Sequence, residues 1–211
     1  MEQAAIGYQQ SAVRMRVAAV VLGAVLVALA AQVAIPLPGT PVPMTLQPLA
    51  VLLVGGLLGA RLGAASMVLY LALGIAGLPV FTPTVPLLGV ARLLGPTGGY
   101  LLAYPVAAFA VGWFTDPGRT PGENPNRAPV PFNPGLASGV RQPSWVRVTV
   151  AVLVGLVLIH MGGLAQLLIL TGDPSGAARL GTLPFLLGDL GKVAVAVAVL
   201  TKLTPAVRAR L

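Results

Sequence analysis

Two opposite charges, Asp189 and Lys192, stand three residues apart inside an apolar stretch near the C-terminal end of the chain. A charge at mid-membrane costs about 2.5–3.5 kcal/mol on insertion scales, so a charged residue there is a functional candidate by default. On a helix this spacing puts both side chains on one face, where they can interact. A carboxylate accepts hydrogen bonds and an ammonium donates them, so the pair can bind a polar group of a small molecule. The alternative is a neutralising pair that only holds two helices together.

A second set of polar residues stands at the ends of other apolar stretches, on the side of the membrane where we also expect Asp189. A pocket for a small amphipathic molecule is mostly apolar with a few convergent polar groups. The candidates for these groups are Thr45, Gln47, Arg92, Thr97 and Tyr100. Arg92 can hold a carboxylate through its guanidinium fork, or it can be a solvated loop charge. Thr45 can instead be a helix N-cap, and Tyr100 an aromatic residue at the membrane interface.

His160 and Gln166 lie in another apolar stretch, and we interpret both as groups that hydrogen-bond between helices. A lone histidine without cysteines or other histidines is no metal site, because such sites need three or four ligands. The chain has no P-loop, HExxH or GxSxG motif. We therefore expect no ATP hydrolysis by this chain, no other enzyme activity, no metal and no cofactor.

The stretches that carry these residues are predicted to be membrane helices. Of the 211 residues, 56% are hydrophobic and 9% are charged, whereas about a quarter of an average soluble domain is charged. This composition excludes an ordinary soluble domain, and its hydrophobicity also excludes disorder. The net charge of +8 comes without basic residues interleaved with aromatics, so it indicates basic loops beside a lipid bilayer and no nucleic-acid partner.

We predict an all-α membrane protein, with residues 1–211 forming one domain of six transmembrane helices. A span needs about 20 apolar residues, and six segments approach this length: 17–35, 46–60, 62–78, 99–114, 146–170 and 184–203. The loop 115–146, rich in proline, glycine and asparagine, is predicted to be a flexible cytoplasmic connector. The first segment also resembles a secretory signal peptide. We interpret it as an uncleaved helix because its apolar run continues to Ile35.

The basic residues orient these helices. With a cytoplasmic N-terminus, ten of the thirteen lysines and arginines fall on the cytoplasmic side, and only Arg92 and Arg179 fall outside. Cytoplasmic loops carry such an excess. We therefore predict a multi-pass protein of a prokaryotic plasma membrane with both termini in the cytoplasm. The long apolar outer segment Leu78–Gly98 is predicted to fold over the helices as a lid.

Four separated stretches resemble, in the same order, the BioY family, the biotin-specific substrate-binding subunits of energy-coupling-factor transporters. They are IPLPGTPVPMTLQPLAVLL from Ile35, GARLGAASMVLYLALGIAGLPVF from Gly59, LLGPTGGYLLAYP from Leu93 and LPFLLGDLGKVAVA from Leu183. The departures are a long polar connector and Gln166, which stands where the family is usually aromatic or apolar. The resemblance implies a six-helix protein that captures biotin from outside with high affinity. It implies that Asp189 and Lys192 contact the ureido ring, and we take Arg92 or Tyr100 as candidates for the carboxylate.

The resemblance also implies partners, namely a membrane coupling subunit and two cytoplasmic ATPases that supply the energy. Ala24 and Ala28 form an AxxxA spacing on the first helix that suits close docking of another helix. A homo-oligomer is a further possibility. The alternatives from the residues alone are a subunit for another vitamin, a proton-driven carrier using Asp189 and His160, and a structural membrane protein.

Overall fold

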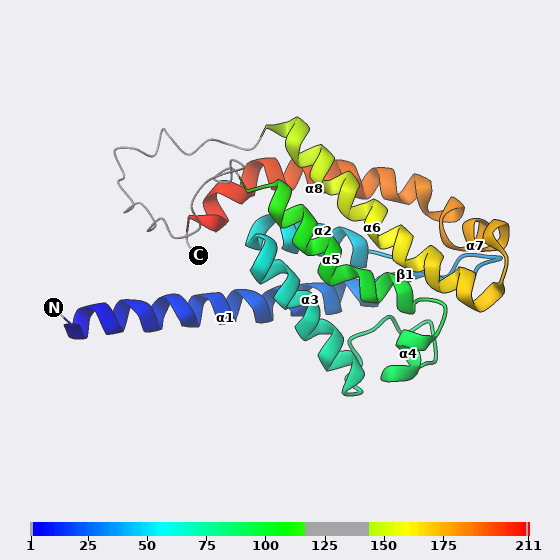
Figure 1. Cartoon of the computed structure of the whole chain (residues 1–211), viewed down its shortest axis with the longest axis horizontal. Coiled ribbons are helices and arrows are strands. Elements are labelled where there is room, and N and C mark those ends of the chain that lie inside the picture. The colour runs from blue at the N-terminus through cyan, green and yellow to red at the C-terminus, as the bar shows by residue number, and fades with distance from the viewer. Residues whose placement is uncertain (1, 117–143, 210) are drawn as a thin grey trace.

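The computed structural model describes residues 2–116, 144–209 and 211, so most of the connector predicted at 115–146 lies outside the described residues. The described part is helical, with one β-hairpin whose two strands have two residues each and one short 3-10 helix (Figure 1). The hairpin pairs β1 (Ala34–Ile35) with β2 (Met44–Thr45), and the 3-10 helix is η2 (Leu183–Phe185). The α-helices are α1 (Glu2–Gln32), α2 (Gln47–Leu58), α3 (Ala60–Ile75), α4 (Val90–Leu94), α5 (Gly98–Phe114), α6 (Trp145–Thr171), α7 (Pro174–Gly181) and α8 (Leu186–Arg208).

Each of the six predicted segments contains a helix, but the helices differ in length. Three of them are long and apolar enough to cross a membrane: Gln10–Gln32, Trp145–Thr171 and Pro174–Arg208. The other three, α2, α3 and α5, are apolar but shorter. At 1.5 Å per residue the 12 residues of α2 span only about 18 Å. This helix contacts α1, α3, α5 and α8, so protein rather than lipid surrounds it, and it does not need a full apolar span.

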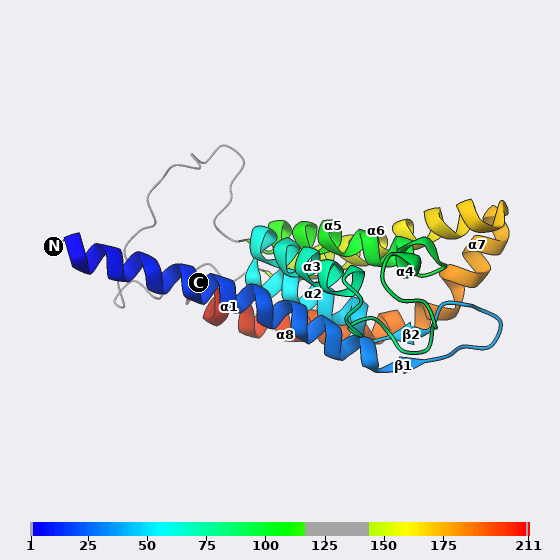
Figure 2. The same cartoon turned by 90° about the horizontal axis from the view of Figure 1, so that it is seen from below.

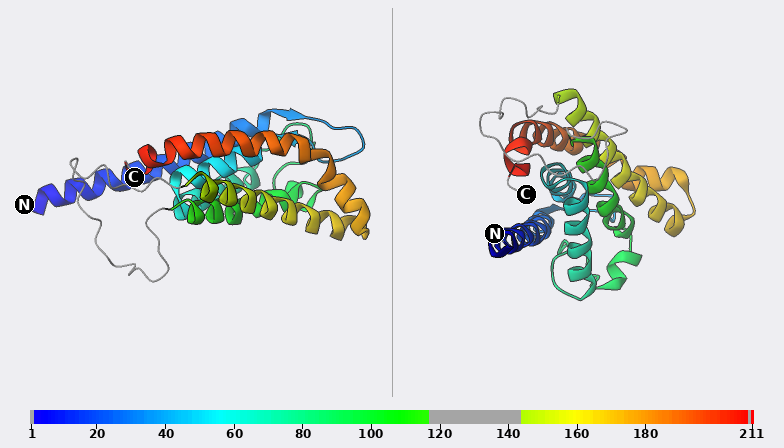
Figure 3. Two further views of the ribbon diagram at one scale, coloured as in Figure 1. Left: turned by 90° about the horizontal axis from the view of Figure 1, so that it is seen from above. Right: turned by 60° about the vertical axis from the view of Figure 1, so that its left-hand side comes forward.

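The two ends of the bundle differ. Both chain termini lie at one end, which we call the terminal end (Figures 1 and 2). The hairpin, α4 and α7 lie at the opposite end, which we call the loop end. The helix α8 runs along the bundle from the loop end to the terminal end, and α1 lies at the edge of the bundle (Figure 3). The loop end is therefore where segments distant in sequence meet.

At the terminal end, Arg208 joins the C-terminal turns of three helices. Its Nη2 donates to the carbonyl oxygen of Gly56 at 2.7 Å and to Oγ1 of Thr115 at 2.8 Å, and its Nη1 donates to the carbonyl oxygen of Thr115 at 3.2 Å. The last carbonyls of a helix have no partner inside it, and a cation there is favourable. Arg208 thereby fixes the end of α8 against the ends of α2 and α5.

Glycines let α5 and α6 cross in backbone contact. A Cβ atom added at Gly99 would overlap the carbonyl oxygen of Gly162 and lie 2.6 Å from Cβ of Gln166, and one added at Gly162 would overlap the carbonyl oxygen of Gly99. Small residues at such crossings permit the close packing on which helix association in membranes depends. The crossing sets the distance between Tyr100 on α5 and His160 on α6.

We expect Gly99→Ala to destabilise the protein by about 1–3 kcal/mol, because the new methyl group must push α5 and α6 apart. The matched control is Gly191→Ala on α8, where an added Cβ meets no atom within 4 Å. Thermal unfolding of the purified protein in detergent measures both variants. Equal melting temperatures for the two variants would contradict the close crossing.

Candidate ligand-binding site

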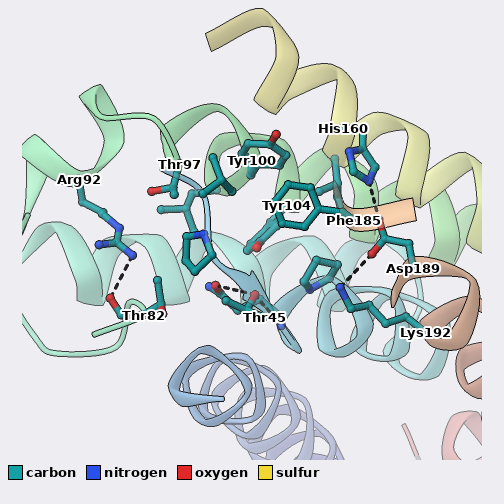
Figure 4. Close-up of a pocket in the computed structure, with 16 residues that line it drawn as sticks. Thr45, Thr82, Arg92, Thr97, Tyr100, Tyr104, His160, Phe185, Asp189 and Lys192 are labelled. Carbon is teal, nitrogen blue, oxygen red and sulfur yellow. Dashed lines mark hydrogen bonds and ion pairs between the residues drawn. The ribbon is translucent and has the colours of Figure 1, made fainter. Parts of the chain in front are cut away.

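A cavity opens at the loop end, between the hairpin, the segment before α4, and helices α5, α6 and α8 (Figure 4). Its non-atom space, part of which is open solvent, is about 530 Å³. The structure brings all seven sequence-predicted ligand contacts to this one cavity: Thr45, Gln47, Arg92, Thr97, Tyr100, Asp189 and Lys192. The apolar part of the lining includes Val42, Pro43, Pro48, Leu101, Ile159 and Phe185.

Asp189 and Lys192 form one pole of the cavity. Both lie near the start of α8, where the positive end of the helix dipole favours a carboxylate. Lys192 Nζ donates to Asp189 Oδ1 at 2.9 Å, as the i,i+3 spacing predicts, and both residues are buried. From α6, His160 Nε2 lies 2.7 Å from Asp189 Oδ2, which confirms its interpretation as a group bonding between helices. This end of the cavity therefore carries one positive and one negative charge, and it offers a ligand both a hydrogen-bond donor, the Lys192 ammonium, and an acceptor, the Asp189 carboxylate.

Arg92 forms the opposite pole. It is 1% exposed, so it is not the solvated loop charge that was one of our two interpretations. Its Nη1 donates to the carbonyl oxygen of Val85 at 2.7 Å, and its Nη2 donates to that of Thr82 at 3.0 Å. Its Nε and the hydroxyl of Thr97 are buried and have no hydrogen-bond partner among the described residues. Buried polar atoms are usually paired, so these two unpaired atoms make this end of the cavity a candidate for ligand binding.

The remaining predicted contacts are tied to the protein itself. The hydroxyl of Tyr100 donates to the carbonyl oxygen of Gly181 at 2.6 Å, so it is less suited than Arg92 to hold a carboxylate. Gln47 Nε2 donates to the hydroxyl of Tyr70 at 2.7 Å, and the hydroxyl of Thr45 accepts from the backbone N–H of Gln47 at 3.3 Å. Leu46 is the N-cap of α2 and no side chain caps this helix, so our local alternative of Thr45 as the N-cap is wrong; its hydroxyl bonds within the turn before the helix.

Other residues line the cavity that were not predicted from the sequence, among them Tyr104 and Thr82. Tyr104 follows Tyr100 by four residues, so both lie on one face of α5, and this spacing could have identified it. Its hydroxyl makes no hydrogen bond within the described part of the chain, and it points toward Thr45 in Figure 4. Thr82 carried no sequence signal, because only the path of the segment after α3 brings it into the lining.

Two segments cover the cavity. The predicted lid lies against the helices: Phe81 is buried and packs edge-on against the Tyr70 ring at a centroid distance of 5.4 Å. Gln166 Nε2 donates to the carbonyl oxygens of Leu93, Leu94 and Gly95, the closest at 3.1 Å, which confirms that it bonds between elements. The loop of the hairpin is the second cover, and there Thr40 Oγ1 donates to the carbonyl oxygen of Leu180 at 2.6 Å.

The predicted docking pair on α1 lies on the inner side of that helix. Ala24 is 1% exposed and belongs to the apolar core, and Ala28 is partly buried against it. The exposed face of α1 is formed instead by larger side chains: Val21, Leu22, Val25, Leu26 and Leu29. The AxxxA spacing therefore serves packing within this chain, because it brings α1 close to the rest of the bundle.

Comparison with known proteins identifies the family. A family model described as the BioY family matches residues 4–209. The chain belongs to the BioY family. It is 36% identical to the probable biotin transporter BioY of Pyrococcus horikoshii over 163 residues, which cover 77% of this chain and 81% of the relative. It is 33% identical to the biotin transporter BioY of Thermotoga maritima over 178 residues, which cover 84% and 89% of the two chains.

A solved structure has the same fold as this BioY family member. It is the crystal structure of the S-component for biotin from an ECF-type ABC transporter. The TM-score is 0.71 and the identity is 26%, with 90% of each chain covered. The stretches from which we recognised the BioY resemblance supply most of the cavity lining, including Thr45, Thr97, Asp189 and Lys192.

Proposed function

We propose that this chain is the biotin-capturing subunit of an ATP-driven transporter and has no catalytic activity of its own. The observation that carries the proposal is the buried Asp189–Lys192 pair facing a mostly apolar cavity. Membership of the BioY family and the printed names of its relatives support it. A purely structural pair would need no cavity beside it, so the cavity favours binding over the structural alternative.

The two poles match the two ends of biotin. The ureido ring offers N–H donors and a carbonyl acceptor, which pair with the Asp189 carboxylate and the Lys192 ammonium. The carboxylate at the other end of biotin pairs with Arg92 and the unpaired hydroxyl of Thr97. The thioether ring and the aliphatic chain lie along the apolar lining between the poles. A ligand without the ureido group would leave the buried charges unpaired, and such sites reject it strongly.

The same proposal gives the chain its place in the cell. The six apolar helices cross a prokaryotic plasma membrane, with the terminal end in the cytoplasm and the loop end outside. The excess of basic residues at the terminal end supports this orientation. A membrane coupling subunit and two ATPases supply the energy, and the exposed face of α1 is the surface that we assign to the coupling subunit.

Binding of biotin to the purified wild-type protein tests the proposal. We expect the protein, produced in cells grown with biotin, to release about one equivalent of biotin on denaturation, as measured by mass spectrometry. Calorimetry on the ligand-free protein should then show tight binding of biotin and no binding of thiamine or riboflavin. Protein without bound biotin and without heat on titration would refute the function.

A further inference from the structure

We propose that His160 is a positioning residue, which aims the carboxylate of Asp189 at the ligand and thereby sets the preference for a neutral cyclic urea. The inference rests on the proposed function. It concerns a residue on α6, whereas the charged pair that it serves lies on α8. The sequence places these residues 29 positions apart, and only the fold brings them together.

The two oxygens of Asp189 are held from opposite sides. Lys192 Nζ donates to Oδ1 at 2.9 Å and His160 Nε2 lies 2.7 Å from Oδ2, and Figure 4 shows Asp189 between the two nitrogens. Lys192 sits one turn along the same helix, so it moves with Asp189. His160 is the contact from another helix, and it fixes the carboxylate relative to the cavity. A carboxylate oxygen can accept two hydrogen bonds, so each oxygen keeps one position for a ligand N–H.

The imidazole is itself held in one orientation. An ionised carboxylate only accepts hydrogen bonds, so Nε2 of His160 carries the hydrogen. In the neutral ring Nδ1 is then an acceptor, and the hydroxyl of Thr182 lies 3.4 Å from it. The Tyr100 ring meets the imidazole edge-on at a centroid distance of 6.2 Å, and the Phe185 ring lies at 6.5 Å. A partner that holds the second nitrogen of a histidine selects its tautomer and its direction.

The charge count explains why a histidine suits this place. The charges of Asp189 and Lys192 cancel, and an imidazole in its neutral form donates through Nε2 without adding a charge. The pole then matches a neutral urea, whose N–H groups and carbonyl need partners but whose charge needs no compensation. An arginine or lysine at position 160 would donate equally well but would leave the pole with a net positive charge.

Two variants at position 160 separate the donor from the bulk of the side chain. His160→Phe keeps an aromatic ring beside Tyr100 and Phe185 but removes the donor, whereas His160→Gln keeps an N–H near the place of Nε2. We expect His160→Phe to weaken biotin binding by about tenfold, the loss that accompanies one hydrogen bond to a charged group. His160→Gln should retain affinity within about threefold of wild type, since it restores that bond.

A second ligand shows whether the effect passes through the urea. The probe is 5-(thiolan-2-yl)pentanoate, which has the thioether ring and the acid chain of biotin but lacks the ureido group. Competition with labelled biotin measures its affinity for each protein. In His160→Phe we expect the affinity for this probe to stay unchanged, so the preference for biotin over the probe falls about tenfold. An equal loss for both ligands would show that His160 only packs, and would overturn the inference.

A third variant leaves the imidazole in place. Thr182→Val removes the hydroxyl beside Nδ1 and should lower the preference for biotin over the probe in the same direction, by about threefold. This measurement also decides the matter if His160→Phe does not fold. An unchanged preference in Thr182→Val, together with an unchanged preference in His160→Phe where that variant folds, would overturn the inference while leaving biotin binding by the wild type intact. Failure of the wild type to bind biotin would instead refute the proposed function.

Discussion

Replacing Asp189 with asparagine is expected to weaken biotin binding by at least about a hundredfold. The amide keeps the shape of the side chain but loses its charge, which leaves the buried ammonium of Lys192 uncompensated. Each hydrogen bond that the ligand makes to the charged carboxylate is worth about 1.5–3 kcal/mol, and each 1.4 kcal/mol of binding energy is about a tenfold change in affinity. The amide also has an NH₂ group in place of one carboxylate oxygen. This group faces a nitrogen donor of the protein and cannot accept a hydrogen bond from the ligand.

The chain offers a matched control in Asp173, which begins α7 at the loop end but lies outside the cavity. Its carboxylate accepts from the Ser175 hydroxyl and from the backbone N–H groups of Ser175 and Gly176, and these hydrogen bonds lower the pKa of Asp173. Asparagine is an equally good N-cap, so Asp173→Asn should bind biotin like the wild type. Calorimetry on both variants compares them, and equal affinities for Asp189→Asn and Asp173→Asn would remove Asp189 from the site.

Replacing Arg92 with glutamine is expected to weaken biotin binding by about tenfold to a hundredfold, the range for losing hydrogen bonds between a buried charge and a charged ligand group. The effect should depend on the ligand carboxylate. Biotinamide, whose acid is an uncharged amide, should bind the wild type more weakly than biotin does. It should lose much less affinity in the variant, because it has no negative charge for the guanidinium to pair.

Arg179 is the control for this second prediction, since it is an exposed arginine at the same end of the bundle and does not line the cavity. Arg179→Gln should leave both ligands unaffected. Arg92 also holds the lid through the carbonyls of Thr82 and Val85, so its loss can weaken binding without any contact to the carboxylate. That outcome has its own signature: biotin and biotinamide would lose affinity by the same factor, and the assignment of Arg92 to the carboxylate would then be wrong.

Much of the fold could be predicted because long apolar stretches in a sequence directly indicate apolar helices. All six predicted segments contain helices, and the predicted ends lie within a few residues of the observed ends for α2, α3, α5 and α6. The short elements at the loop end were missed, namely the hairpin, α4 and α7. These elements are stabilised by contacts between distant segments, such as Gln166 with the end of α4 and Thr40 with the end of α7. The hydrophobic pattern within one segment does not indicate contacts between segments that are distant in sequence.

The candidate site was predictable where charge itself is the signal. Asp189, Lys192 and Arg92 stand out because charged residues are rare in this chain and expensive in apolar surroundings. The bond from His160 to Asp189 could not be foreseen, because it depends on how α6 lies against α8. The prediction that Ala24 docks a partner was wrong for a related reason. An AxxxA spacing identifies a face of a helix, but it does not indicate whether that face contacts its own chain or another.

The lid and the C-terminal end of α7 are held largely by side chains that donate to main-chain carbonyls. Arg92, Tyr100 and Thr40 are the donors, and the acceptors belong to Thr82, Val85, Leu180 and Gly181. Every residue type carries a carbonyl, so natural selection can act on the donors while leaving most acceptor positions free. Across homologues, Leu180 and Val85 should therefore drift in identity, whereas the three donor positions should resist exchange, and the loops should keep their shape while their sequences diverge.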